Sequence, residues 1–108
     1  MAISTAVLQG GIFLGTTTAA LYTVPASRAA WVKRAVFTNT SNAAVTFTVS
    51  VSRAGGGSFV LISARSVPAG GSDLAPELVS LALGSGDGVS ASASVPAVVS
   101  VVISGLVS

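Results

Sequence analysis

Cysteine and histidine are both absent from this chain of 108 residues. Without cysteine there is no disulfide, catalytic thiolate or zinc–thiolate site, and the redox compartment cannot be inferred. Without histidine, the usual general base of a nucleophilic triad is missing. Acids are also scarce, since Asp73, Glu77 and Asp87 are the only ones. Pro76 separates the first two and argues against a helix that would align them as a catalytic pair. We therefore predict that the chain is not an enzyme and that its acids cap turns.

Charge of either sign is sparse. Only 7% of the residues are charged, against roughly 25% in an average domain. Five Lys and Arg residues against three Asp and Glu residues give a net charge of +2, which is too small to make nucleic acid the expected partner. The 51% hydrophobic content argues against disorder. A surface this poor in charge is often covered by a partner or by copies of the same chain.

A long hydrophobic run is missing as well. The most apolar stretch, Val95–Val107, is interrupted by Pro96, Ser100 and Ser104 and is shorter than the about 20 residues of a membrane-spanning helix. The first 15 residues contain no basic residue, which makes a poor signal peptide. We expect a soluble chain without a membrane partner and without export by a standard signal.

Two glycine-rich segments invite a test for metal or phosphate binding. "GSGDG" at Gly84–Gly88 offers one carboxylate, whereas a calcium loop needs several oxygen ligands at alternating positions. "RAGGGS" at Arg53–Ser58 lacks the Gly-Lys-Ser/Thr ending of a phosphate-binding loop. We predict turns at both places, and no metal or cofactor site.

Alternation of apolar and hydroxyl residues with a period of two dominates the chain. It is clearest at 45–52, 89–95 and 99–104, and it predicts half-buried strands with one apolar face. Segments 58–66 and 78–83 are apolar at both parities, as in strands that are covered on both sides or lie at an interface. Gly, Asn, Asp and Ser clusters separate these runs. The pattern predicts an all-β, single-domain antiparallel β-sandwich or jelly roll of about 7–8 short strands.

The N-terminal residues 1–19 differ from the rest of the chain, which we assign to the sandwich (20–108). They are rich in Gly and Thr and hold an isolated apolar cluster, Ile12, Phe13 and Leu14. Two interpretations stay open: a first strand of the sandwich, or an arm that reaches a neighbouring subunit.

A basic segment lies near the middle of the chain. Residues 29–39 and 44–53 flank a short turn, which predicts a hairpin. Neither face of the first strand is purely polar, and a β-bulge near Lys33–Arg34 would fit this pattern. The two parities are Trp31, Lys33, Ala35 and Phe37 on one side and Val32, Arg34, Val36 and Thr38 on the other. We expect one face to form core and the other to contribute to an interface, without assigning which.

Ala20–Val51, "ALYTVPASRAAWVKRAVFTNTSNAAVTFTVSV", resembles a recurrent pattern in small structural proteins of tailed bacteriophages. The pattern has an LYTVP-like strand, a polar turn, a basic strand that ends in T-N-T-S, and an alternating Val/Thr strand. Val67–Ser94, with its "PAGG" turn and "GSGD" segment, and the final "VVSVVISG" are similar to the same pattern. The resemblance covers about residues 20–105 and implies a compact β-sandwich within a virion. It supplies no catalytic residues.

The resemblance leads to the following expectation of function. The chain is expected to be a structural virion protein, made in the host cytoplasm, and most simply a decoration or cement protein on the capsid exterior. Its partners would be the major capsid protein or other virion proteins, and it would form a homo-oligomer, plausibly a trimer. The candidate interface residues are Ile12, Phe13, Leu14, Tyr22, Trp31, Lys33, Arg34 and Phe37.

Two alternatives remain open. One is a neck or tail accessory protein that binds a receptor or glycan, which exposed Tyr22 or Trp31 in a cleft would support. The other is a small nucleic-acid-binding module that uses the same aromatic residues as stacking platforms beside the five dispersed cations.

Overall fold

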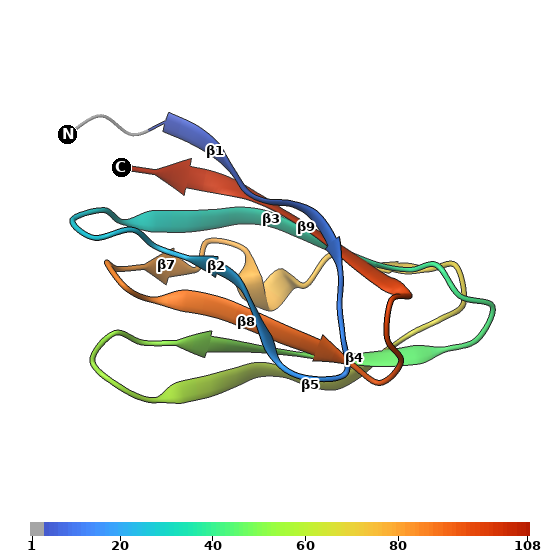
Figure 1. Ribbon diagram of the computed structural model, residues 1–108. Helices are drawn as coiled ribbons and strands as arrows, with labels where there is room; N and C mark the ends of the chain where they lie inside the picture. The colour runs from blue at the N-terminus through green and yellow to red at the C-terminus, as the bar shows by residue number, and fades with distance from the viewer. Residues whose placement is uncertain (1–3) are drawn as a thin grey trace.

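Two antiparallel sheets pack face to face (Figure 1). The computed structural model describes the backbone of residues 4–108 and the side chains of residues 7–108. Sheet A has the strand order β1-β9-β3-β6, with β7 also paired to β3, and sheet B has the order β2-β8-β4-β5. The elements are β1 (Ser4–Phe13), β2 (Ala19–Thr23), β3 (Ala30–Asn39), β4 (Val45–Ser52), β5 (Ser58–Val67), β6 (Ser72–Asp73), the 3-10 helix η1 (Pro76–Leu78), β7 (Ala82–Leu83), β8 (Gly88–Ala93) and β9 (Val99–Val107).

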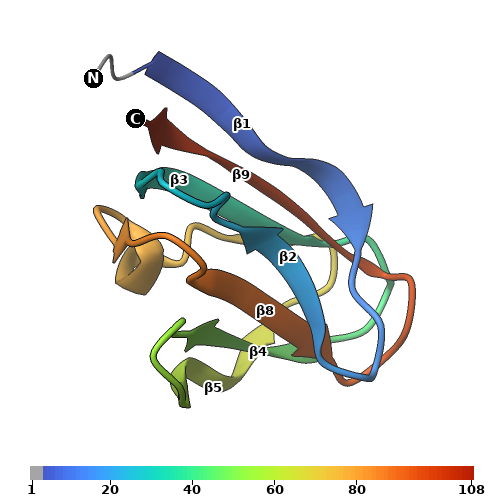
Figure 2. The ribbon, with the colours of Figure 1, turned by 60° about the vertical axis from the view of Figure 1, so that its left-hand side comes forward.

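The strand order is that of a jelly roll. The paired strands are nested along the chain: β4 pairs with β5, β3 with β6 and β7, β2 with β8, and β1 with β9. The chain therefore has the connectivity of one long antiparallel hairpin that is folded into two facing sheets. Figure 2 shows the two layers from a second direction. The predicted all-β antiparallel sandwich is thus confirmed. The described strands number nine rather than the predicted 7–8, in part because one position of the roll is split into β6 and β7.

The apolar faces predicted from the alternation fill the space between the sheets. Buried side chains recur at every second position of β4, β8 and β9. Phe37 of sheet A stacks on Phe47 of sheet B, with ring centroids 4.6 Å apart and planes inclined by 19°. Both sheets therefore contribute side chains to the core. Its largest fully buried members are Phe37, Phe47, Ile62, Leu78, Leu83, Ile103, Val24, Val32, Val49, Val67, Val89 and Val99.

The predicted hairpin of residues 29–39 and 44–53 is wrong. β3 lies in sheet A and β4 in sheet B, so the connection crosses between the sheets. Buried Asn39 holds this corner: its Nδ2 donates to the carbonyl oxygens of Ala43 and Val67, at 2.7 and 3.1 Å. Its Oδ1 accepts the N–H of Ser41 at 2.9 Å. These bonds satisfy backbone groups of the turn and of the end of β5, which would otherwise lack partners near the buried corner.

The segment 78–83 is not one strand either. Only Ala82–Leu83 pairs in a sheet, as β7, while η1 occupies the start. Pro76 fixes the backbone for a helical turn and lacks an N–H, which suits the first position of η1. Leu78 of that turn is buried in the core. This segment thus contributes buried apolar side chains to one edge of the sandwich instead of extending a strand.

The N-terminal segment is a strand. β1 pairs with β9 from Ser4↔Val107 to Phe13↔Ser100 and forms one edge of sheet A. This agrees with the first-strand interpretation of residues 1–19; residues 1–3 lie outside the described part. The only helix among the described residues is η1, with three residues, and no described helix could cross a membrane.

Each of the four sheet edges is irregular. β1 has register shifts at Val7/Gln9 and Gln9/Ile12, and β2 has one between Ala20 and Tyr22. β5 shifts twice against β4, while β6 and β7 contain two residues each. Bulges and short strands make an edge a poor template for a further strand.

Candidate interaction surface

A β-bulge in β3 determines which side chains leave the core. Val32 pairs with Gly105 and Arg34 with the adjacent Ser104, so Lys33 is the extra residue. This is the bulge predicted from the sequence. Before the bulge the even positions face the core, and after it the odd positions do, from Ala35 onward. The consecutive side chains of Lys33 and Arg34 are therefore both exposed.

Gly105 allows this bulge to pack against β9. A Cβ atom at this position would overlap the carbonyl oxygen of Trp31 and lie 3.1 Å from Cδ1 of Leu8. Gly105 itself is buried. The missing side chain thus lets the backbones of β3 and β9 approach closely, as expected where a strand glycine faces a bulge.

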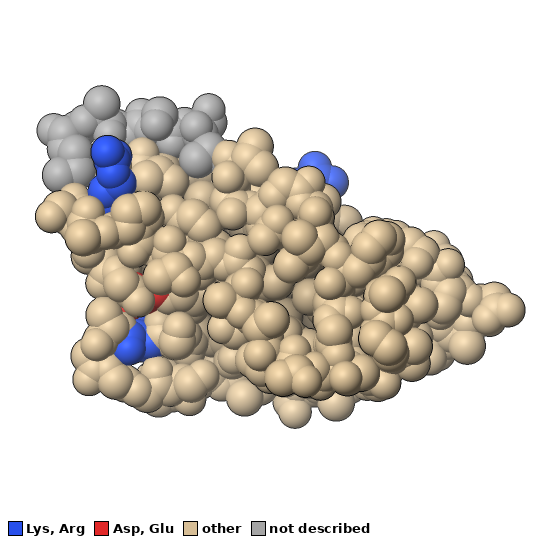
Figure 3. Space-filling model, viewed as in Figure 1, with Lys and Arg blue, Asp and Glu red and all other residues tan. Residues whose placement is uncertain are grey.

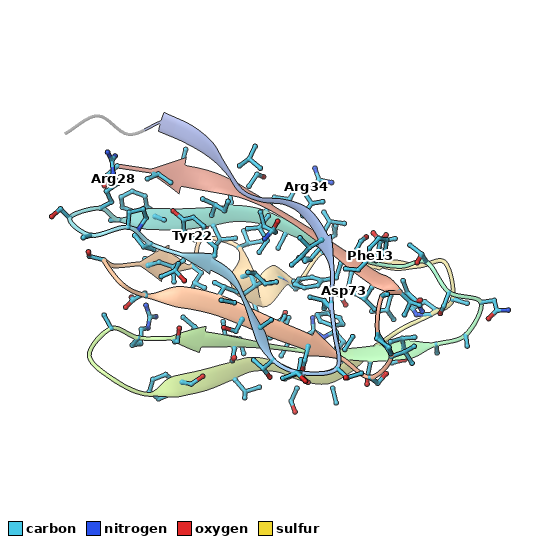
Figure 4. All side chains as sticks on the ribbon, in the orientation of Figure 1. Phe13, Tyr22, Arg28, Arg34 and Asp73 are labelled. Carbon is cyan, nitrogen blue, oxygen red and sulfur yellow. The ribbon has the colours of Figure 1, made fainter. Side chains whose placement is uncertain are left out.

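The outward side of sheet A forms a mixed apolar and cationic surface, which we call the sheet-A face. The register places Trp31 beside Leu106 and Val36 beside Val102. Exposed fractions are 73% for Val7, 55% for Phe13 and 46% for Val102. In Figure 4, Arg34 points away from the layer between the sheets. The face comprises Val7, Phe13, Trp31, Lys33, Arg34, Val36, Val102 and Leu106.

A hollow of about 230 Å³ opens on this face, lined by Trp31, Lys33, Ser80 and Leu106. Ser80 comes from the loop between η1 and β7. Its N–H donates to the carbonyl of Val32 at 2.6 Å, while the N–H of Val32 donates to the carbonyl of Leu81 at 3.0 Å. These bonds hold the loop against β3. The lining residues of the hollow are two apolar side chains, a lysine and a serine, a composition that suits an apolar group with a negative or hydrogen-bonding end.

The outward side of sheet B, the sheet-B face, is lined by hydroxyl groups. The register places Thr48 beside Ser92 and Ser50 beside Ser90. Toward β5, Thr46 pairs with Ser66 and Ser52 with Ser58. None of these eight positions carries a charge. Exposed Val60 of β5 lies at the edge of this face, opposite Ser50.

All three acids of the chain are held in ion pairs away from the sheet-A face. Asp87 pairs with Arg53 at 2.7 Å, while Arg65 of β5 pairs with Glu77 and, at 3.4 Å, with Asp73. The Arg65 pairs join sheet B to β6 and η1 of sheet A. Figure 3 shows how little of the visible surface is charged.

Three cations have no ion-pair partner among the described residues: Arg28, Lys33 and Arg34. Arg28 donates to the carbonyl oxygen of Ser108 at 2.9 Å. No hydrogen bond links the ammonium group of Lys33 or the guanidinium group of Arg34 to a described residue. Two adjacent, unpaired cations therefore lie within the sheet-A face.

Asp87 closes the loop that precedes β8. It accepts the N–H groups of Ala54 and Gly84, each at 2.9 Å, together with the guanidinium group of Arg53. These backbone hydrogen bonds, from Ala54 first and then Gly84, and the bond from Arg53 lower the pKa of Asp87 from 3.8 to about 2. Asp73 likewise accepts the N–H of Ala75 at 2.7 Å. The predicted turn-capping role is confirmed for Asp73 and Asp87.

The structure brings four of the predicted interface residues onto the sheet-A face: Phe13, Trp31, Lys33 and Arg34. Ile12 is 38% exposed and pairs with the buried Val101, so it lies at the rim of the core. The remaining three predicted residues lie elsewhere.

Leu14 and Phe37 are side chains of the core, with 3% and 0% exposure, and their prediction as contact residues is wrong. The bulge causes the error for Phe37, because it sends this ring and Trp31 to opposite sides despite their shared parity. Tyr22 on β2 is half-buried against the core. The prediction missed Val102, although Val102 interrupts the hydroxyl parity of Ser100 and Ser104.

Comparison with known proteins adds no relative. A scan against protein-family models, a search of curated proteins and a search of solved structures each return no match. The described residues contain no cluster of three or more His, Cys, Asp or Glu side chains.

Proposed function

We propose that this chain is a structural virion protein of a tailed bacteriophage, a decoration or cement protein that binds the capsid exterior through its sheet-A face. The observation that carries the proposal is an exposed apolar surface on a small, charge-poor domain. Val7, Phe13 and Val102 are all close to half exposed or more, and such patches mark interaction sites. The jelly-roll topology supports it by analogy only, because capsid proteins and lectins both use this fold.

The proposed mechanism is stabilisation by many weak, repeated contacts. Apolar burial contributes about 25 cal/mol per Å², while association itself costs about 4–15 kcal/mol. A single small face therefore contributes only a modest net free energy of binding. The net stabilisation adds up over a shell when each copy bridges neighbouring capsid subunits, or when copies join as a homotrimer.

Location and copy number in purified particles test this proposal. The protein is quantified by mass spectrometry against the major capsid protein, and its density is then located by cryo-electron microscopy. We expect a copy number comparable to that of the capsid protein and density on the shell. A few copies at the neck or tail would contradict the decoration role, and absence from particles would overturn any virion role.

The hollow beside Trp31 favours a second candidate, a neck or tail protein that binds a receptor or glycan. An indole ring next to a hydroxyl group and an ammonium group is a suitable wall for a polar ring such as a sugar. Under this alternative, low copy number would accompany saturable quenching of Trp31 fluorescence by cell-surface glycans of the host. Under the decoration role, those glycans leave Trp31 fluorescence unchanged.

A further inference from the structure

The arrangement of charge on the chain limits what the sheet-A face can bind. Lys33 and Arg34 project side by side from the bulge, between the outward residues Trp31 and Val36 of the same strand. A partner that covered the apolar neighbours would also remove water from both cations. Such a partner has to supply negative groups, since a desolvated charge without a counter-charge is strongly unfavourable.

A second copy of this chain that docked by the same face would not supply those groups. Its three acids are held by Arg53 and Arg65. In a two-fold symmetric contact the same patch meets itself, so two sheet-A faces would bring four cations together without a carboxylate. Like charges that face each other across an interface select against that pairing. A two-fold symmetric dimer through this face is therefore disfavoured, and a different protein is the better source of free carboxylates.

The surroundings of the cations favour a protein partner over nucleic acid. Phosphate recognition needs a run of cations and rewards little apolar contact, whereas here exposed Val7, Phe13 and Val102 occupy the same face. Base stacking needs exposed aromatic platforms, and Trp31 is already half-buried beside Leu106. The irregular edges argue further for docking on the face rather than for addition of a strand.

We propose that the sheet-A face docks onto an acidic, apolar surface of another protein, with carboxylates of that protein paired to Lys33 and Arg34. The inference rests on the proposed function in taking another virion protein as the partner, and it adds the chemistry of the contact. The hollow of Trp31, Lys33, Ser80 and Leu106 would receive an apolar side chain next to one of these carboxylates.

The chain offers two unique probes on this face, since Trp31 is its one tryptophan and Lys33 its one lysine. The first experiment follows the fluorescence and the single indole N–H resonance of Trp31 while a blocked peptide of alternating Glu and Leu residues is added. The matched probe replaces each Glu by Gln and keeps the apolar groups. We expect saturable binding of the Glu peptide, about tenfold tighter than that of the Gln peptide.

Variants of the protein link this preference to the two cations. K33Q/R34Q is expected to reduce the preference for the Glu peptide to about twofold or less, since the carboxylates then lose their partners. R28Q, which removes a cation outside the face, serves as the matched control and is expected to keep the preference. Equal affinity for the two peptides, including no binding of either, would overturn the proposal.

Two further outcomes of the same titrations would also overturn it. One is tighter binding of a thymidine oligonucleotide than of the Glu peptide at physiological salt, which would assign the face to nucleic acid. The other is a concentration-dependent shift of the Trp31 indole resonance in the protein alone, together with dimers in analytical ultracentrifugation. That result would show that the face binds a second copy.

Carbodiimide cross-linking of intact particles separates this inference from the proposed function. Carbodiimide activates a carboxylate, and attack by the Lys33 amine forms an amide bond and releases a urea. We expect Lys33 to be joined to an Asp or Glu of a different virion protein. If the protein is abundant in particles but Lys33 gains no such link, the inference fails and the proposed function stands. If the protein is absent from particles while the peptide preference holds, the proposed function fails and the contact chemistry stands.

Discussion

The sheet-A face presents exposed valines, Phe13 and Trp31 around two unpaired cations, whereas the sheet-B face presents paired Ser and Thr hydroxyl groups without charge. Both faces arise from the same alternating pattern, and both lie over one shared core. The difference is confined to the outward residues and to the bulge at Lys33. Hydroxyl groups stay hydrated at little cost, and the apolar exceptions in sheet B are exposed Phe59 and Val60 on its edge strand β5. The sheet-A face differs in combining exposed apolar side chains with charge.

The largest expected effect comes from removing the contact that joins the sheets beneath the two faces. Phe37→Ala deletes one ring of the Phe37–Phe47 stack in a fully buried position. We expect a loss of about 3–5 kcal/mol in the free energy of unfolding, measured by urea denaturation. Phe13→Ala on the sheet-A face is the control, with an expected loss below about 1 kcal/mol. Similar losses for both variants would contradict the assignment of these rings to core and surface.

The next effect concerns the bulge that distinguishes the two faces. Gly105→Ala places a methyl group against the carbonyl of Trp31, and we expect it to cost about 1–3 kcal/mol of stability. Amide resonances of β3 around Lys33 should shift most. Gly10→Ala is the matched control, because its Cβ would lie at an ordinary 3.7 Å from Val7. An unchanged midpoint for Gly105→Ala would show that the bulge does not need this glycine.

A smaller effect concerns the ion pair of Arg53 and Asp87 at one end of sheet B. Because the pKa of Asp87 is about 2 in the folded chain against 3.8 as its ordinary value, the unfolded chain takes up this proton first on acidification. Asp87 therefore contributes stability that is complete above about pH 5 and is lost as the pH falls toward about 2. We expect the thermal midpoint of the wild type to fall over this range.

Asp87→Asn isolates the contribution of this carboxylate. The variant should have a lower midpoint than the wild type at neutral pH and a smaller decline on acidification, and the two curves should converge near pH 2. Parallel curves would show that another group carries the acid sensitivity.

The smallest effect on stability is expected from reversing the cations of the sheet-A face. Lys33 and Arg34 are exposed and have no ion pair among the described residues. Replacing both by Glu should change the free energy of unfolding by less than about 0.5 kcal/mol. Ser90→Glu with Ser92→Glu makes the matched change on the sheet-B face. A large loss for the Lys33 and Arg34 variant alone would mean that these cations support the fold rather than a contact.

The sequence pattern was sufficient for the fold class because Val45–Val51 alternates strictly and Val99–Ile103 alternates except at Val102, and the apolar parity of both segments is the core. It was insufficient for topology. The turn after Asn39 has the composition of a hairpin turn, but the deciding fact is the buried side chain of Asn39, which bonds to Val67 far along the chain. The composition of the turn alone cannot indicate a contact between residues so far apart in the sequence.

The same limit applies to the interface. A bulge near Lys33–Arg34 was predictable, yet its exact position decides whether Trp31 or Phe37 faces outward. That position is fixed by Gly105, on the opposite strand and distant in sequence. Leu14 was mistaken for a contact residue because isolated apolar residues near a terminus look alike whether they anchor a strand or project from it.

The irregular edges bear on how such a chain could accumulate in a cell. A protein with 7% charged residues and mean hydropathy of +0.86 has little electrostatic repulsion to keep its copies apart at high concentration. The sheet edges offer no regular row of backbone groups with which another chain could pair as a strand. The registers of β1, β2 and β5 are shifted, and β6 and β7 have only two residues each. The folded chain is thus a poor template for the growth of fibres through its sheet edges.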